Sequence, residues 1–373
     1  MMNWNTIWGQ AITPFPPLLL FLMPPTRSTI RFSVVSPMSG DKLRLGFSNI
    51  FGKEPYIIGE CTVKSGGARV QITKDGNRQI VVPCGGRIYS DEIALDVASG
   101  ESIEISMYFS NRLREGNAIE EHTNLVKGKN LTQSDFYPPL KRTNFQQKYN
   151  FHSFIPSLDS IEVNTSHDPA VIVAFGDSIT QQSTWTKPLT AKLFERYKDR
   201  AVLINKGISG NRILYDGRGL LGRIFGEAAK DRLDRDVLSI PNVKTVIFAL
   251  GTNDIGHSKK NRKEYATASQ ISTAIQELVE KMNARRIKVI GTTLTPRMGS
   301  MAYEDYHEVT RKELNAWIRS YDGFDHVVSF DEVTRNPDKP DQMIKAYHCG
   351  DHLHPSKEGG KAMAEAFDLD KVF

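Results

Sequence analysis

The stretch Val171-Ile-Val-Ala-Phe-Gly-Asp-Ser-Ile-Thr180 decides the fold. It opens with five apolar residues, which is typical of a strand that is covered on both faces in an α/β protein. Gly176 permits a sharp turn, and the segment 186–197 beyond it predicts a helix. We therefore expect Ser178 at the carboxyl end of a buried strand, where open α/β sheets bind ligands. Taken alone, Asp177 and Ser178 are equally consistent with a helix cap that has no chemical role.

The chain beyond this strand alternates between strand and helix patterns. Further strands are predicted at 201–204, 243–250, 287–294 and 327–330, and helices at 220–233, 265–284, 303–321 and 356–367. Strict alternation predicts a parallel sheet with helices on both faces. For 169–373 we therefore expect a three-layer α/β/α domain with a doubly wound parallel sheet, as in flavodoxin-like folds.

The segment 26–168 has a different pattern. Short runs of alternating apolar and polar residues, such as 29–34, 42–47 and 102–108, are separated by clusters of turn residues. The pattern predicts an all-β sandwich or jelly-roll domain, with 110–168 as a long loop and linker. Such a domain would pack against its neighbour and shape a cleft, and glycan binding is the alternative role.

The first 25 residues contain one apolar run, Pro14-Phe-Pro-Pro-Leu-Leu-Leu-Phe-Leu-Met-Pro-Pro25. Its apolar part is too short to span a bilayer, and prolines interrupt both ends. The first basic residue is Arg27, and no cleavage site of small residues follows, so the run does not fit a secretory signal. For 1–25 we expect an extended segment docked on the protein, without membrane insertion, and a cytoplasmic location.

Composition excludes several classes of function. The 373 residues are 24% charged and 39% hydrophobic, as in soluble globular proteins of one or two domains. The net charge is +5, but Lys and Arg are scattered among Asp and Glu, so nucleic acid is not an expected partner. The three cysteines, Cys61, Cys84 and Cys349, are far apart and odd in number, which argues against a disulfide framework. The sequence leaves homo-oligomerisation open.

Polar motifs follow the predicted strands. Gly207-Ile-Ser-Gly-Asn211 and Gly251-Thr-Asn-Asp254 come after the second and third strands, and Asp351-His-Leu-His354 lies near the C-terminus. The carboxyl ends of parallel strands meet at one edge of a sheet, so the first two motifs should lie near Ser178. A serine, a histidine with an acid three residues earlier, and several neutral donors are the groups that acyl transfer requires.

Together with Gly176-Asp-Ser-Ile179, these motifs resemble the SGNH, or GDSL, hydrolase family of esterases and lipases over roughly 171–373. More loosely, the β region is similar to the N-terminal domain of a bacterial subgroup that includes xylanase-associated acetyl esterases. The resemblance implies that Ser178 is the nucleophile, His354 the general base and Asp351 the carboxylate that orients it.

The same resemblance implies an oxyanion hole made of the Ser178 N–H, the Gly210 N–H and the Asn253 side chain. It also implies an esterase that removes acetyl groups from carbohydrate, with acetylated xylo-oligosaccharides as the expected substrate. One alternative is an acyl esterase or lysophospholipase that acts on lipids or other small esters. A non-catalytic sugar-binding protein on the same scaffold is another alternative, but it would have no need of a base paired to a nucleophile.

Several residues near these motifs have competing interpretations. The segment His348-Cys-Gly-Asp-His-Leu-His354 contains five side chains that can bind metals. A metal site would leave Ser178 without a role, so we expect neither a metal nor a cofactor. His352 competes with His354 as the base, but the Asp-x-x-His spacing favours His354. Gln181-Gln182 stands where relatives often have a glycine. Asp177 and Asp254 are expected to cap helices and hydrogen bond within loops.

Overall fold

The computed structural model describes residues 3–15, 27–110, 115–119, 123–127, 129, 131, 153–260, 263–301 and 303–373. Residues 16–25 of the apolar N-terminal run, and most of the predicted linker up to residue 152, lie outside the described residues. The chain forms two compact units. The N-terminal unit comprises Met1–Pro169, Tyr197–Ile204 and Arg218–Ile224, and the C-terminal unit comprises Ala170–Arg196, Asn205–Gly217 and Phe225–Phe373.

Among the described residues of the N-terminal unit, antiparallel strands form three sheets. The first contains, in spatial order, β1 (Asn3–Gly9), β14 (Leu158–Thr165), β4 (Gly40–Ser48) and β8 (Arg87–Tyr89), with β9 (Ile93–Val97) also paired to β4. The second contains β12 (Thr123–Lys127), β3 (Ser28–Val35), β10 (Ser102–Phe109), β5 (Tyr56–Ser65) and β6 (Ala68–Ile72), with β7 (Ile80–Val82) on β5. The third contains β13 (Ser153–Pro156), β11 (Glu115–Ile119) and β2 (Thr13–Pro14). The strand-rich N-terminal region is as predicted.

Two parts of this region differ from the expectation. The predicted loop and linker at 110–168 contains β11, β12, β13 and β14, so that interpretation is wrong for these strands. Of these, β14 lies between β1 and β4. The N-terminal segment supplies β1, which pairs with β14 within the sheet and is not a separate docked segment. The strand pattern of β14 was hidden because it carries charged residues that are buried. One of them, Glu162, is 1% exposed and lies 2.7 Å from a guanidinium nitrogen of Arg44 on β4.

A parallel sheet organises the C-terminal unit, and only residues 201–204 of its strand β16 are assigned to the N-terminal unit. Its strands are, in spatial order, β16 (Ala201–Gly207), β15 (Ala170–Gly176), β17 (Val243–Ala249), β18 (Lys288–Thr292) and β19 (His326–Val328). The chain enters at β15, moves to one side and then returns past it, which is the doubly wound 2-1-3-4-5 order. Residues 171–175 are fully buried, as expected for a strand covered on both faces.

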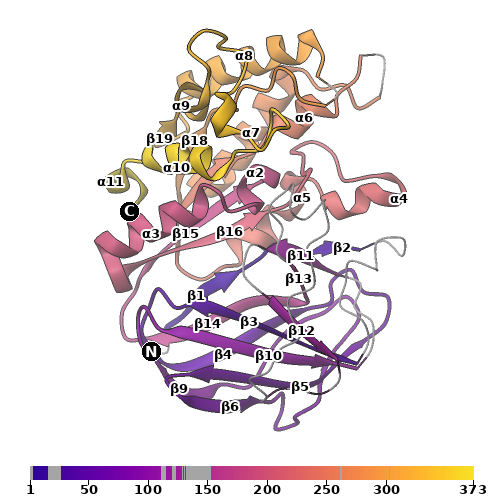
Figure 1. The fold of residues 1–373 in the computed structure, drawn as a ribbon, viewed down its shortest axis with the longest axis vertical. Helices are drawn as coiled ribbons and strands as arrows, with labels where there is room; N and C mark the ends of the chain where they lie inside the picture. The colour runs from indigo at the N-terminus through magenta and orange to yellow at the C-terminus, as the bar shows by residue number, and fades with distance from the viewer. Residues whose placement is uncertain are drawn as a thin grey trace. The chain divides into compact units, whose positions relative to one another are not determined.

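Helices cover both faces of this sheet, which confirms the three-layer α/β/α prediction (Figure 1). The α-helices are α2 (Ser178–Gln181), α3 (Thr186–Tyr197), α4 (Gly219–Gly222), α5 (Ala229–Leu233), α6 (Thr252–Gly256), α7 (Ala268–Asn283), α8 (Asp305–Ser320), α9 (Phe330–Thr334), α10 (Lys357–Glu365) and α11 (Leu369–Val372). The ammonium of Lys192 on α3 donates to the carbonyl of Ala364 on α10 at 3.1 Å, whereas α7 packs beside α8. The single helix predicted at 220–233 is wrong, because the chain turns at Gly226 with φ +72°.

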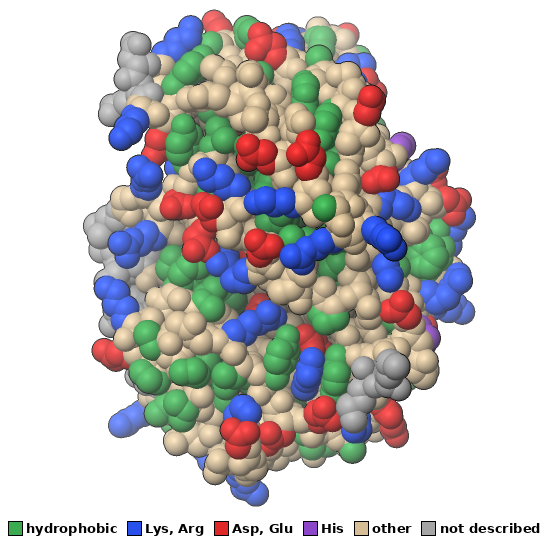
Figure 2. Space-filling view, turned by 180° about the vertical axis from the view of Figure 1, so that it is seen from behind, with side chains coloured by type: hydrophobic (Ala, Val, Ile, Leu, Met, Phe, Trp, Pro, Cys, Tyr) green, Lys and Arg blue, Asp and Glu red, His purple; other side chains and the backbone are tan. Residues whose placement is uncertain are grey.

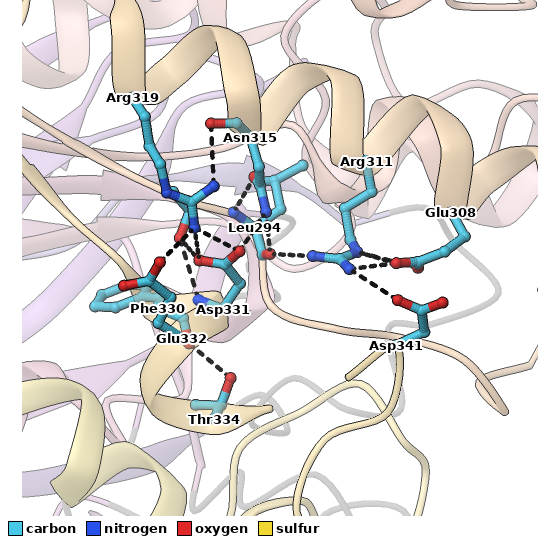
Figure 3. A network of polar contacts seen from close by, with 11 residues as sticks. Leu294, Glu308, Arg311, Asn315, Arg319, Phe330, Asp331, Glu332, Thr334 and Asp341 are labelled. Atoms are coloured by element: carbon cyan, nitrogen blue, oxygen red, sulfur yellow. Dashed lines mark hydrogen bonds and ion pairs between the residues drawn. The ribbon is translucent and has the colours of Figure 1, made fainter. Parts of the chain in front are cut away.

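A polar network ties α8 to the end of β18 (Figure 3). The side chain of Asn315 donates to the carbonyl of Leu294 and accepts from its N–H, and Arg311 donates to the same carbonyl at 3.1 Å. Arg319 binds both carboxylate oxygens of Asp331, at 2.6 and 2.7 Å. The network holds the loop that follows β18.

A cavity of about 140 Å³ adjoins this network. It is lined by Arg311, Lys312, Asn315, Arg319, Asp331, Arg335, Pro340 and Asp341. Most of its basic side chains form ion pairs within the protein: Arg311 with Glu308, Arg319 with Asp331, and Lys312 with Asp341. We therefore regard these charges as structural.

The surface carries both signs of charge. On the face drawn in Figure 2, basic and acidic side chains are interspersed, with apolar side chains between them. Within the part of the chain that the structure describes, no helix combines the length and apolar character needed to span a bilayer.

Candidate active site

The side chains of Ser178, His354 and Asp351 form a chain of hydrogen bonds, although Ser178 is far from the other two in the sequence. The Nε2 atom of His354 lies 2.8 Å from the hydroxyl oxygen of Ser178, and its Nδ1 atom lies 2.6 Å from a carboxylate oxygen of Asp351. Ser178 is the first residue of α2, directly beyond the carboxyl end of β15. All three residues are largely buried, with Ser178 4% and His354 9% exposed.

The carboxylate of Asp351 is held in one orientation. Its second oxygen accepts from the backbone N–H groups of Leu353 at 3.1 Å and His354 at 3.0 Å. Burial alone would raise the pKa of Asp351, but the hydrogen bonds and the charge of His354 lower that pKa to about 2. An ionised carboxylate only accepts hydrogen bonds, so Nδ1 of His354 carries the proton and Nε2 is free to accept one from Ser178.

Asp177 caps the short helix that begins with Ser178. Its carboxylate accepts from the N–H of Ile179 at 3.0 Å, so the predicted capping role is confirmed. The residue is only 2% exposed. Burial raises the pKa of Asp177 from 3.8 to about 7, and the N–H of Ile179 opposes this change only in part.

The raised pKa of Asp177 predicts a pH-dependent loss of stability. Between about pH 4 and pH 7 the unfolded chain releases this proton before the folded protein does, so the free energy of unfolding falls as pH rises. A shift of about 3 units corresponds to a fall of roughly 4 kcal/mol. Asp177→Asn keeps an oxygen for the Ile179 N–H but does not titrate. In this variant we expect the free energy of unfolding to fall by roughly 4 kcal/mol less across this window than in wild type.

Urea unfolding of wild type and Asp177→Asn at pH 4.5, 6 and 7.5 measures the difference. Asp341→Asn is the control, because hydrogen bonding lowers the pKa of Asp341, despite its burial, and so its titration lies below this window. Parallel stability profiles of wild type and Asp177→Asn would contradict the prediction.

Hydrogen bonds join the loops beyond β16 and β17 to each other and to the end of β15. The loop beyond β16 carries Gly210, whose φ is +71°, and a Cβ at this position would come within 2.4 Å of the Phe225 ring. Only glycine fits there without strain. On α6, the amide nitrogen of Asn253 donates to the carbonyl of Asn211 at 3.1 Å, which joins the loops beyond β16 and β17. The N–H of Ile208 donates to the carbonyl of Gly176 at 3.1 Å and joins the loop beyond β16 to the end of β15.

Asp254 on α6 holds the backbone at Ile213 and Leu214, which follow the loop that carries Gly210. Its carboxylate accepts from the N–H groups of Ile213, at 2.8 and 3.0 Å, and Leu214, at 3.0 Å. Burial raises the pKa of Asp254 to about 6, and these two N–H groups act in the opposite direction. The expected role in loop hydrogen bonding is confirmed.

Three other residues that the sequence singled out are His352, Gln181 and Gln182. The ring of His352 packs against the ring of His348, with 4.3 Å between the two ring centroids. Gln181 ends α2 and Gln182 is its C-cap, and both are buried, at 6% and 1% exposed. Across the described ranges, no group of three or more His, Cys, Asp or Glu side chains is arranged to hold a metal ion.

One residue of this region went unnoticed in the sequence. Arg232 on α5 is fully buried and donates to the side chain of Asn211, to Asp236, and to the carbonyls of Gly176 and Lys206. Its sequence context, Ala-Lys-Asp-Arg-Leu-Asp-Arg, is that of an exposed helix, so no local signal marked it.

Comparison with known proteins gives two kinds of match. The model of the GDSL-like lipase/acylhydrolase family matches residues 174–362, which is half of the chain. No match was found among curated proteins.

Solved structures with low sequence identity were also found. A GDSL-like lipase from Bacteroides thetaiotaomicron is 21% identical, over 55% of this chain and 91% of that one, with a TM-score of 0.40. An acetyl xylan esterase from Geobacillus stearothermophilus is 18% identical, over 55% of this chain and 97% of that one, with a TM-score of 0.42.

The family model spans β15 to α10 and includes the serine, the loops beyond β16 and β17, and the Asp351–His354 segment. The chain therefore belongs to the GDSL-like lipase/acylhydrolase family and is a carboxylic ester hydrolase.

Proposed function

We propose that the protein is a serine esterase that removes O-acetyl or other short acyl groups from carbohydrate, with acetylated xylo-oligosaccharides as substrates. One observation carries the chemistry: His354 lies within hydrogen-bond distance of both the Ser178 hydroxyl, at 2.8 Å, and the Asp351 carboxylate, at 2.6 Å. A histidine in this position can take a proton from the serine while the carboxylate stabilises the charge that it gains.

The reaction proceeds in two acyl transfers. His354 Nε2 takes the proton of the Ser178 hydroxyl as its oxygen attacks the ester carbonyl, and the C–O bond to the sugar breaks as His354 returns the proton to the departing oxygen. Water then attacks the acyl-enzyme with the same proton movements and releases acetate and Ser178. Asp351 keeps Nδ1 protonated throughout and is not itself protonated.

The oxyanion of each tetrahedral intermediate is bound by the N–H groups of Ser178 and Gly210 and by the Asn253 amide. The left-handed backbone at Gly210 and the bond from Asn253 to the Asn211 carbonyl hold two of these donors in fixed loops. Donors fixed before the reaction need no reorganisation as charge develops, and one of them contributes about 3 kcal/mol to barrier lowering in other hydrolases.

Two observations favour a hydrophilic substrate with a small acyl group. After the buried Ile179, α2 continues with Thr180 and Gln181, which are buried and polar, as is the C-cap Gln182. In addition, the N-terminal β region resembles that of acetyl esterases associated with xylanases.

The test combines covalent labelling with a substrate profile. A fluorophosphonate should label the folded protein once, and peptide mapping should place the label on Ser178. The enzyme should release acetate from acetylated xylo-oligosaccharides, and hydrolysis of nitrophenyl esters should fall as the acyl chain lengthens from acetate to laurate. Activity should be unchanged by a chelator.

Other outcomes would favour other functions. A preference for long acyl chains without acetate release would indicate a lipid esterase. A folded protein that binds oligosaccharide but takes no label would be a sugar-binding protein, and activity lost to a chelator and restored by a divalent ion would indicate a metallohydrolase.

A further inference from the structure

Arg232 is a buried cation that joins separate segments of the C-terminal unit. It is 0% exposed and donates from Nε to the Asn211 side chain at 2.9 Å and from Nη2 to the carbonyl of Gly176 at 2.9 Å. Nη1 donates to the carbonyl of Lys206 at 2.9 Å and to the carboxylate of Asp236 at 3.1 Å. The planar guanidinium therefore contacts the ends of β15 and β16 and the loop beyond β16 at once, which the single ammonium of a lysine cannot do.

Two of these partners adjoin the groups to which we assign catalysis. Gly176 ends β15, two residues before Ser178. Asn211 follows Gly210, and its carbonyl accepts from the Asn253 amide at 3.1 Å. The Arg232 side chain thus joins the strand that leads to the nucleophile to the loop that carries the Gly210 N–H, one of the proposed oxyanion donors.

Further contacts hold both Arg232 and its partner Asn211 in place. Its guanidinium lies over the Phe175 ring, 4.1 Å from the centroid, on the strand that leads to Ser178. On the other side, the amide nitrogen of Asn211 donates to the carbonyls of Phe225 and Glu227, both at 2.8 Å. Burial lowers the pKa of Arg232 to about 10, with the neighbouring Asp236 opposing this, so it stays charged at neutral pH.

We propose that Arg232 is a positioning residue that fixes the distance between the Ser178 nucleophile and the Gly210–Asn211 loop, which carries the Gly210 N–H and accepts from the Asn253 amide. The inference rests on the proposed serine esterase function and adds a residue that does not touch substrate. Donors and nucleophile must be held within about 0.5 Å of the productive geometry, and a displacement of 1 Å can lower the rate by about 100-fold.

The first test is Arg232→Lys, which keeps the charge and leaves Asp236 paired with Arg235, whose Nε lies 2.9 Å from that carboxylate. With kcat normalised to sites titrated by fluorophosphonate, we expect a fall of roughly 10- to 100-fold and a KM within about twofold of wild type. Lost positioning weakens interactions made only in the transition state, so kcat falls while KM does not change.

The second variant, Asn211→Ala, removes the acceptor of Arg232 Nε together with the amide that donates to the carbonyls of Phe225 and Glu227. It leaves the other three partners of Arg232 in place. It decides the question if Arg232→Lys does not fold, and we expect the same fall in kcat with unchanged KM. In the double variant the losses should not multiply, because both changes break one linkage.

Arg311→Lys is the matched control. Arg311 is also buried, at 3% exposed, and is also paired with an acid, Glu308, and bonded to a backbone carbonyl, that of Leu294 (Figure 3). It should lose stability as Arg232→Lys does but keep its kcat per titrated site.

Two results would overturn the inference: kcat per titrated site within twofold of wild type in both Arg232→Lys and Asn211→Ala, or losses that multiply in the double variant. The proposed function fails separately, because in that case wild type itself would neither take the label on Ser178 nor hydrolyse esters.

Discussion

Replacing Ser178 by alanine should lower kcat by about 10⁶-fold, since the variant has no nucleophile to form the acyl-enzyme. The change removes the hydroxyl that lies 2.8 Å from His354 but keeps the backbone N–H that we assign to the oxyanion hole. Activity should therefore not fall to the rate of water alone, because oxyanion donors and substrate binding sustain about 10³- to 10⁴-fold catalysis without the nucleophile. Hydrolysis of nitrophenyl acetate and fluorophosphonate labelling measure the two effects.

Ser300→Ala is the matched control for this change. Ser300 is a serine of the same unit with similar burial, at 6% exposed, and its hydroxyl has no hydrogen-bond partner among the described residues. The control should keep both labelling and activity within about twofold of wild type. If Ser178→Ala retained more than a hundredth of the wild-type rate, a different nucleophile or an activated water would have to carry the reaction.

The elements that carry the site could be predicted because their signals are local. The apolar run that ends at Gly176 becomes β15, and the helix predicted at 356–367 becomes α10 at Lys357–Glu365. The residues expected to meet, Ser178 and His354, are 176 positions apart, and the structure brings them within 2.8 Å. The order of the motifs in the sequence predicted this contact, because the Ser178 motif follows a strand of the sheet and the Asp351–His354 motif lies in the last loop of the same domain.

What the sequence did not reveal depends on partners distant in the chain. β14 contains the buried acids Asp159 and Glu162, and these suggested a loop because their partners, Arg87 and Arg44, lie on other strands. Arg232 likewise occurs in a charged segment that suggested solvent exposure. A buried ionised side chain is stable only where paired and hydrogen-bonded, and that pairing is visible only once the chain is folded.

In Asp351→Asn, two backbone N–H groups would decide which way the new side-chain amide points. One oxygen of Asp351 accepts from the N–H groups of Leu353 and His354, so asparagine must place its own oxygen there and turn its NH₂ group toward Nδ1 of His354. Nδ1 would then become the acceptor, and the ring proton would move to Nε2, which faces Ser178. A histidine in that tautomer cannot take the serine proton.

We therefore expect Asp351→Asn to lower kcat by about 10⁴-fold at neutral pH, with little change in KM. The folded pKa of Asp351, about 2, lies below its usual 3.8, so its contribution to stability is present above about pH 4 and is lost as pH falls toward 2. The variant should thus be somewhat less stable than wild type at pH 7 but similar to it at pH 2. Asp341→Asn, whose carboxylate pairs with Lys312 away from the serine, should keep full activity. A rate for Asp351→Asn within tenfold of wild type would mean that another carboxylate orients His354, and the proton on Nδ1 would need a different acceptor.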